Sequence, residues 1–301
     1  MIAERKGTQM EHSENKTVTK VYTYDYEEYE EQGKGPETMV EEILADPELP
    51  GLRELIVGDW GNAWENDCQA IIDGITEHAD RFSHIEKLFF GDMNYEQCEV
   101  SWIMQGDYSK LWSALPGLRE LTIQGSTDLV LGDICHAGLE SLTIICGGLP
   151  SYVIRSVQEA KLPNLKKLIL YIGSDDYGFD GNADTIRELL EKADFPQLSY
   201  LGIVDSEIQD EVTEVVLSSK FMGQISTLDL SMGTLTEKGG ALLLAQLPSW
   251  PNIRKLDIHY HYVPEEMVEE LEKLPMEVDA SEAEEPDVYD GTVYLNAMLT
   301  E

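Results

Sequence analysis

The chain has 301 residues, 42% of them hydrophobic, which is enough for a large core in one elongated domain or two compact ones. Asp and Glu number 58 against 21 Lys and Arg, so the net charge is −37. This charge excludes nucleic acids and anionic membranes as expected partners, because both are bound through Lys and Arg, and it favours a basic protein. Acidity that serves solubility alone is the open alternative.

The first segment, residues 1–16, is expected to be disordered, and it lacks the apolar run of a signal peptide. No stretch of 18 apolar residues is present, so no membrane span is expected. The four cysteines, which form no C-x-x-C pair and no zinc spacing, are Cys68, Cys98, Cys135 and Cys146. They are typical of reduced thiols, and together with the two observations above they predict a cytoplasmic protein. No cofactor is expected.

Residues 17–51 are expected to form an N-terminal cap, with a strand and loop over 17–32 and a helix over 36–46. One six-residue pattern, L-x-x-L-x-[LIVF], then recurs eight times within residues 52–281, at spacings of 33, 33, 21, 26, 33, 27 and 28 residues. Its second anchor is always leucine: Leu55, Leu88, Leu121, Leu142, Leu168, Leu201, Leu228 and Leu256. The first leucine enters a turn, and the next two anchors point inward from a short strand.

Helical patterns separate most of these motifs, with apolar residues at intervals of three and four. The expected helices cover 65–82, 152–162, 184–195, 210–220, 236–247 and 264–274. One strand and one helix cannot bury their apolar faces alone, so the units must stack.

This pattern resembles the leucine-rich repeat, with spacings similar to those of the ribonuclease-inhibitor-like class. The segments "SWI" (101–103), "GGL" (147–149) and "DDYG" (175–178), together with the histidine-rich last strand, further resemble an uncharacterised family of bacterial leucine-rich-repeat proteins. The resemblance covers roughly residues 40–280. It implies an α/β solenoid shaped like a horseshoe, with short parallel strands on the concave face and helices on the convex face, and it implies no reaction.

Two features depart from the common repeat. The 21-residue unit from Leu118 to Leu139 has no room for a full helix and should cross the convex side in an extended form. The asparagine that often ends the motif is absent. Its position is occupied by Trp60, Met93, Ser126, Gly147, Gly173, Ser206, Gly233 and His261. Residues 276–281 are expected to be a truncated ninth rung, and 282–301 a partly mobile acidic tail.

The strand alternation predicts which side chains face the concave groove. The middle position of each strand is apolar in the early rungs and acidic in the late rungs. We expect the partner-binding residues to be Phe89, Ile169, Tyr171, Tyr200, Asp229, Asp257 and His259. Exposed aromatic residues are also common without any role, which is the open alternative for the aromatic members.

In "DIHYH" (257–261), Asp257, His259 and His261 occupy alternate positions and would share the concave face, with Asp229 one rung away. Carboxylate and imidazole on adjacent rungs can bind a divalent metal. The repeat already explains the alternation, however, so a polar partner-binding patch is the preferred interpretation.

Other motifs favour structural roles. A calcium loop starting at Asp176 would have Gly178 and Arg187 at ligand positions, which predicts an acidic loop instead. Trp102 is expected to pack over the convex edge, and a surface anchor is the open alternative. No nucleophile elbow, P-loop or H-E-x-x-H motif is present.

We therefore expect a monomeric, non-catalytic scaffold whose acidic concave surface binds a basic protein, as an inhibitor or immunity-like protein or as an adaptor. The alternative is a metal-binding protein or enzyme that uses the corner formed by Asp229, Asp257 and His259.

Overall fold

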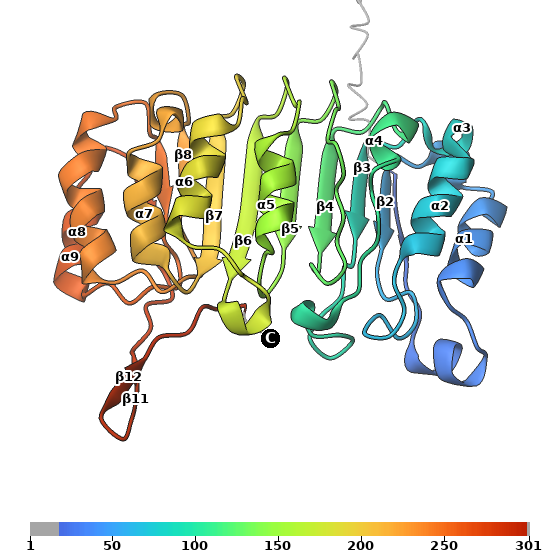
Figure 1. Ribbon diagram of the computed structural model, residues 1–301, viewed down its shortest axis with the longest axis horizontal. Coiled ribbons are helices and arrows are strands. Elements are labelled where there is room, and N and C mark those ends of the chain that lie inside the picture. Colours follow the sequence, from blue (N-terminus) through green and yellow to red (C-terminus); the bar gives the residue numbers. More distant parts are fainter. Residues whose placement is uncertain (1–17, 300–301) are drawn as a thin grey trace, which may run out of the picture.

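The computed structural model describes residues 18–299, so the disorder expected for residues 1–16 lies outside the described part of the chain. Within residues 18–299, ten short strands form one open sheet, and each strand pairs in parallel with its neighbours in chain order (Figure 1). They are β1 (Thr19–Tyr22), β2 (Glu54–Val57), β3 (Lys87–Phe90), β4 (Glu120–Gln124), β5 (Ser141–Ile145), β6 (Lys167–Gly173), β7 (Tyr200–Ser206), β8 (Thr227–Asp229), β9 (Lys255–Asp257) and β10 (Glu277–Asp279). The predicted α/β class with an open parallel sheet is confirmed.

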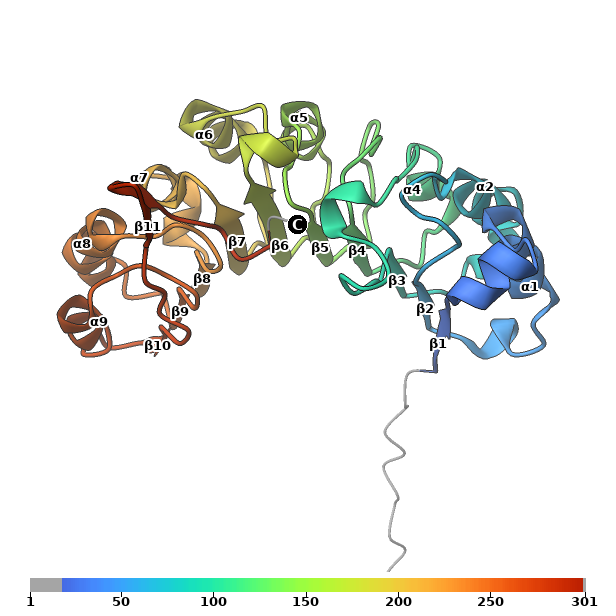
Figure 2. The same cartoon turned by 90° about the horizontal axis from the view of Figure 1, so that it is seen from below.

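Helices cover one face of this sheet, and Figure 2 shows the sheet as an arc with the helices on its outer side. Those within residues 18–299 are α1 (Pro36–Ala45), α2 (Gln69–Glu77), α3 (Ala79–Phe82), α4 (Leu111–Ala114), α5 (Ser151–Gln158), α6 (Ala183–Lys192), α7 (Gln209–Leu217), α8 (Glu237–Gln246) and α9 (Glu265–Leu271). All but α4 lie within or close to segments in which the sequence predicts a helix. We call the strand-lined side of the arc the inner face.

A column of leucines sets the register of the sheet. Leu55 of β2 lies opposite Leu88 of β3, and the same pairing continues through the second anchors of the next six strands to Leu256 of β9. These eight side chains are at most 2% exposed. Burying one leucine contributes roughly 1.5–3 kcal/mol, so this register is strongly preferred over a shift by one residue, which would turn every anchor to the inner face.

A second contact joins successive units at the amino ends of the strands. The residue directly before the first anchor reaches back to backbone carbonyl groups of the preceding unit in four places. The donors, with His84 as the Nε2–H tautomer, are His84 to Leu49, Asn164 to Ala137, Gln224 to Phe195 and Leu198, and Asn252 to Met222 and Ile225. These side chains satisfy carbonyl groups that no strand partner reaches. The segments "LPN" (162–164) and "WPN" (250–252), which precede the first anchors, therefore connect units as well as forming turns.

Residues 125–138, between β4 and β5, contain no helix, as their short spacing predicts. Single bridges hold the segment to its neighbours, with Val130 opposite Asp107 and Cys135 opposite Lys161. The indole N–H of Trp112 donates to the carbonyl oxygen of Leu131 at 2.7 Å. The outer layer is therefore thin at this point of the arc.

The acidic C-terminal region begins with a hairpin of β11 (Asp287–Tyr289) and β12 (Thr292–Tyr294) and then returns to the body of the protein. Figure 1 shows the hairpin projecting from the edge where the sheet strands end. The backbone N–H of Met298 donates to the carbonyl oxygen of Met232 at 2.8 Å, and Ala297 is buried. A bridge between His261 and Ala283 holds the chain before the hairpin, so both of its ends are fixed to the fold.

Candidate partner-binding surface

The inner face carries a continuous middle column of side chains, one from each strand. Strand pairing places its members directly opposite one another. From β1 to β10 they are Val21, Ile56, Phe89, Thr122, Thr143, Ile169, Gly202, Asp229, Asp257 and Asp279. The column is apolar or neutral over seven strands and acidic over the last three.

The predicted aromatic anchors lie on this face but do not form one patch. Phe89 and Tyr171 are half-buried. They are far apart, because Phe89 is on β3 and Tyr171 is on β6, three strands away. Ile169 is only 9% exposed, because it packs over Gly202 of the next strand, where an added Cβ would lie 3.1 Å from it. Burial and the nearby Asp229 raise the pKa of Tyr171 to about 12, so its hydroxyl stays neutral.

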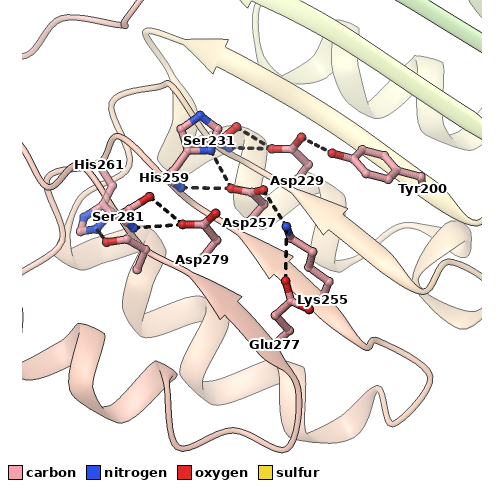
Figure 3. Close-up of polar contacts among 11 residues, drawn as sticks. Tyr200, Asp229, Ser231, Lys255, Asp257, His259, His261, Glu277, Asp279 and Ser281 are labelled. Atoms are coloured by element: carbon pink, nitrogen blue, oxygen red, sulfur yellow. Dashed lines mark hydrogen bonds and ion pairs between the residues drawn. The ribbon is translucent and has the colours of Figure 1, made fainter.

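The acidic end of the column is more compact. Asp229, Asp257 and Asp279 lie directly opposite one another on β8, β9 and β10, with the strands about 4.8 Å apart (Figure 3). We call these three residues the acidic column. Like charges placed directly opposite one another destabilise a sheet, so the arrangement has a cost that a bound cation would remove.

Each carboxylate of the acidic column is held by the residue two positions later. The Oδ1 atom of Asp229 accepts hydrogen bonds from the Ser231 hydroxyl at 2.6 Å and from the Ser231 backbone N–H at 3.2 Å. Asp279 and Ser281 repeat this pair at 2.7 and 3.2 Å. These hydrogen bonds fix the carboxylates in place, and those from Ser281 lower the pKa of Asp279.

Two neighbours flank the acidic column. The Tyr200 hydroxyl donates to Asp229 Oδ2 at 2.6 Å, and burial together with the Asp229 charge raises the pKa of Tyr200 far above its usual value. Lys255 Nζ lies 3.4 Å from Asp257 Oδ2 and 3.5 Å from Glu277 Oε1 (Figure 3). One lysine shared between two carboxylates leaves the group with a net negative charge.

His259 and His261 do not share a face, so the expected pairing of the two histidines is wrong. The Nδ1–H of His259 donates to Asp257 Oδ1 at 2.7 Å on the inner face. His261 is fully buried, and its ring lies between the Ala280 carbonyl and the Val263 backbone N–H. The cause is Tyr260, whose φ of 56° interrupts the strand alternation and turns the next side chain inward.

Burial lowers the pKa of His261, which keeps the imidazole neutral inside the fold. Because Val263 N–H donates to Nδ1, the His261 proton resides on Nε2 and is donated to the Ala280 carbonyl at 3.1 Å. His261 therefore fixes the turn after β9 and offers no group to the groove.

The corner of Asp229, Asp257 and His259 does not have the arrangement of a metal site. Within residues 18–299, no group of three or more His, Cys, Asp or Glu side chains is arranged to hold a metal ion. The carboxylates are occupied by the hydroxyl, imidazole and ammonium groups described above. The loop at residues 175–180 is also structural, since Asp180 accepts the Ser151 backbone N–H at 2.6 Å.

Two residues of this surface and its edge escaped the sequence prediction. Asp279 belongs to the short ninth rung, where "VDAS" (278–281) repeats the Asp-x-Ser spacing of Asp229 and Ser231. Trp102 does not pack over the convex edge as expected, because it is 58% exposed. It ends a 3₁₀ turn, Val100–Trp102, in which three-residue periodicity turns Val100 and Ile103 inward and Trp102 outward.

Comparisons with known proteins find solved structures that resemble the chain. No family model and no curated protein matches the chain. The chain is similar to a Bacteroides fragilis protein of known crystal structure, with 42% identity over 88% of this chain and 75% of that one and a TM-score of 0.83. A match to a TLR13–ssRNA13 complex has 12% identity over 72% of this chain and 40% of that one, and its TM-score of 0.30 is too low to support an argument.

Proposed function

The chain belongs to the family of that Bacteroides fragilis protein, and we propose that it is a non-catalytic scaffold built of leucine-rich repeats of the ribonuclease-inhibitor-like class. In this proposal the inner face is the concave side of a horseshoe, and the acidic column binds a basic protein partner. Occlusion of the partner, as by an inhibitor or immunity-like protein, and recruitment by an adaptor are the two versions of this role.

The observation that carries the proposal is the acidic column itself. Three carboxylates on adjacent strands are held in place by Ser231, Ser281 and His259 and are neutralised in part by the single lysine Lys255. Their fixed geometry reduces the entropy lost when a partner binds, and a guanidinium or ammonium group would relieve their mutual repulsion. Nearby Tyr200 and Tyr171 supply the aromatic surface that is common at the centre of interfaces.

The charge of the whole chain supports the same partner class. A net charge of −37 accelerates the encounter with a basic protein. This electrostatic acceleration weakens as the salt concentration rises. Within residues 18–299, no helix has the length and apolar composition needed to cross a bilayer. At the corner of Asp229, Asp257 and His259, the carboxylates already have hydroxyl, imidazole and ammonium partners, which favours the scaffold over the metal-binding or enzymatic alternative.

Affinity capture from a cell extract with three matched baits tests the proposal. The first bait is the wild type, and the second carries D229N, D257N and D279N, which keep hydrogen-bonding side chains. The third carries E41Q, E191Q and E269Q on exposed positions of α1, α6 and α9, and it loses the same three negative charges.

We expect a basic protein that the wild type and the helix variant both retain and that the acidic-column variant loses. Retention should also fall steeply as salt rises. If the helix variant loses the partner and the acidic-column variant keeps it, the partner binds the outer side and the proposal is wrong.

A further inference from the structure

An aromatic pocket lies at the edge of the sheet where the first three strands end, separate from the acidic column. The segments that follow β1, β2 and β3 come together there (Figure 1). The pocket has a volume of about 420 Å³, and five aromatic side chains line it: Tyr26, Tyr29, Trp64, Tyr95 and Trp102. The carboxyl ends of parallel strands are a common place for ligand sites in open α/β sheets.

The rings form walls at steep angles to one another. Tyr29 meets Tyr26 with ring centres 5.6 Å apart and planes at 70°, and it meets Trp64 at 6.3 Å and 81°. Tyr95 and Trp102 complete the rim and are 77% and 58% exposed. Large aromatic side chains that are this exposed to solvent lose the stabilisation that burial would give. Their clustering therefore indicates a ligand-binding site.

The pocket is also acidic. Glu96 and Glu99 line it, and an adjoining hollow that shares Tyr26 and Tyr29 adds Asp25 and other carboxylates. Among the described residues, no lysine or arginine lines the aromatic pocket. Within residues 18–299, lysines lie over the rings of Tyr22, Tyr24, Tyr200 and Phe221. None of these four rings lines the aromatic pocket.

We propose that this pocket binds an organic cation of the alkylated ammonium class. The electron-rich faces of tryptophan and tyrosine attract a cation within about 6 Å of the ring centre, and the methyl groups of such a cation bury apolar area against the same rings. Glu96 and Glu99 neutralise its charge at longer range. A bare metal ion does not fit, because the lining lacks a set of convergent oxygen ligands.

The acidic environment distinguishes a cation from a neutral apolar guest. A neutral ligand would gain only the contact with the rings, whereas a cation also gains from Glu96, Glu99 and the field of the whole chain. The site is independent of the acidic column, since it is built from the opposite end of the sheet, and either site can fail without the other.

Ligand titration followed by tryptophan fluorescence and calorimetry tests this site. The probes are choline, its neutral isostere 3,3-dimethylbutanol, and a lysine amide carrying a trimethylated side chain. Trp64 and Trp102 lie in the pocket, whereas Trp60 and Trp112 are buried in the core, so a ligand changes the fluorescence of the first pair. The stronger of the two cationic probes identifies whether a free cation or a modified lysine is the source.

We expect at least one cation to bind and the neutral isostere to bind tenfold or more weakly. Y95A and W102A should each reduce cation affinity by about fivefold or more. The matched control is Y289A, because Tyr289 is 72% exposed on the distant hairpin, and it should bind as the wild type does. Equal affinity for the isostere, unchanged affinity of both pocket variants, or no binding of either cation would overturn the proposal.

Discussion

Gly173 shows why a glycine stands in a position where related motifs carry asparagine. It ends β6 with a φ of 70°, and a Cβ atom there would lie 1.7 Å from the carbonyl oxygen of Gly147. The two backbones approach more closely than any side chain allows. Both the left-handed conformation and the contact require glycine at this position.

We therefore expect G173A to lower the free energy of unfolding by about 2 kcal/mol or more. The matched control is G51A, because an added Cβ at Gly51 would meet nothing within 4 Å. Urea denaturation of both variants measures the difference. Equal stability of the two would mean that β5 and β6 do not approach in this way.

Asp205 gives a pH-dependent prediction. Its side chain is fully buried, its Oδ1 accepts the Leu299 backbone N–H at 2.8 Å, and burial raises its pKa to about 8. Because the unfolded value is about 3.9, the native state holds a proton between these values that the unfolded state has released. The stability from this group therefore falls as pH rises through that window.

D205N removes the titration and keeps a hydrogen-bond acceptor for Leu299. Unfolding measured at pH 5 and at pH 8 should show that the wild type loses about 2 kcal/mol or more relative to D205N on going to the higher pH. Parallel stability curves for the two proteins would show that Asp205 is already ionised in the fold at pH 5.

Side-chain hydrogen bonds at the amino ends of the strands join successive units of the repeat. Asn252 donates to the carbonyls of Met222 and Ile225, both at 2.7 Å, and so joins the turn before β9 to the unit that precedes it. N252A leaves both partly buried carbonyls without this donor. We expect it to lower the unfolding free energy by about 1–2 kcal/mol in denaturant titration, and an unchanged midpoint would contradict the tie.

The elements could largely be predicted from the sequence, because the second-anchor leucines and the amphipathic segments recur at compatible spacings. The site could be predicted only in part. His261 was misplaced because the positive φ of Tyr260 has no local sequence signature, and Asp279 was missed because β10 belongs to a rung cut short. The exposed Trp102 depends on a 3₁₀ turn, Val100–Trp102, inside an irregular insertion. Such departures from periodicity are set by tertiary packing.

The excess of 58 acidic residues over 21 basic ones imposes mutual repulsion on the folded chain. Most lysines that offset this repulsion form exposed ion pairs, such as Lys192 with Glu188 and Lys238 with Glu211. Exposed ion pairs contribute little to stability, so the main effect of added salt is to screen the repulsion between carboxylates. We expect the melting temperature to rise between about 0.02 and 0.3 M NaCl, and a fall would show that attractive pairs dominate instead.

The most direct test of the proposed role is carbodiimide labelling of carboxyl groups, read by mass spectrometry, in the free protein and in its complex with the captured partner. The proposal predicts protection of Asp279 and the adjoining Glu277 on binding, with unchanged labelling of Glu41 and Glu191 on the outer helices. Protection confined to the outer helices, with β9 and β10 labelled as in the free protein, would contradict it.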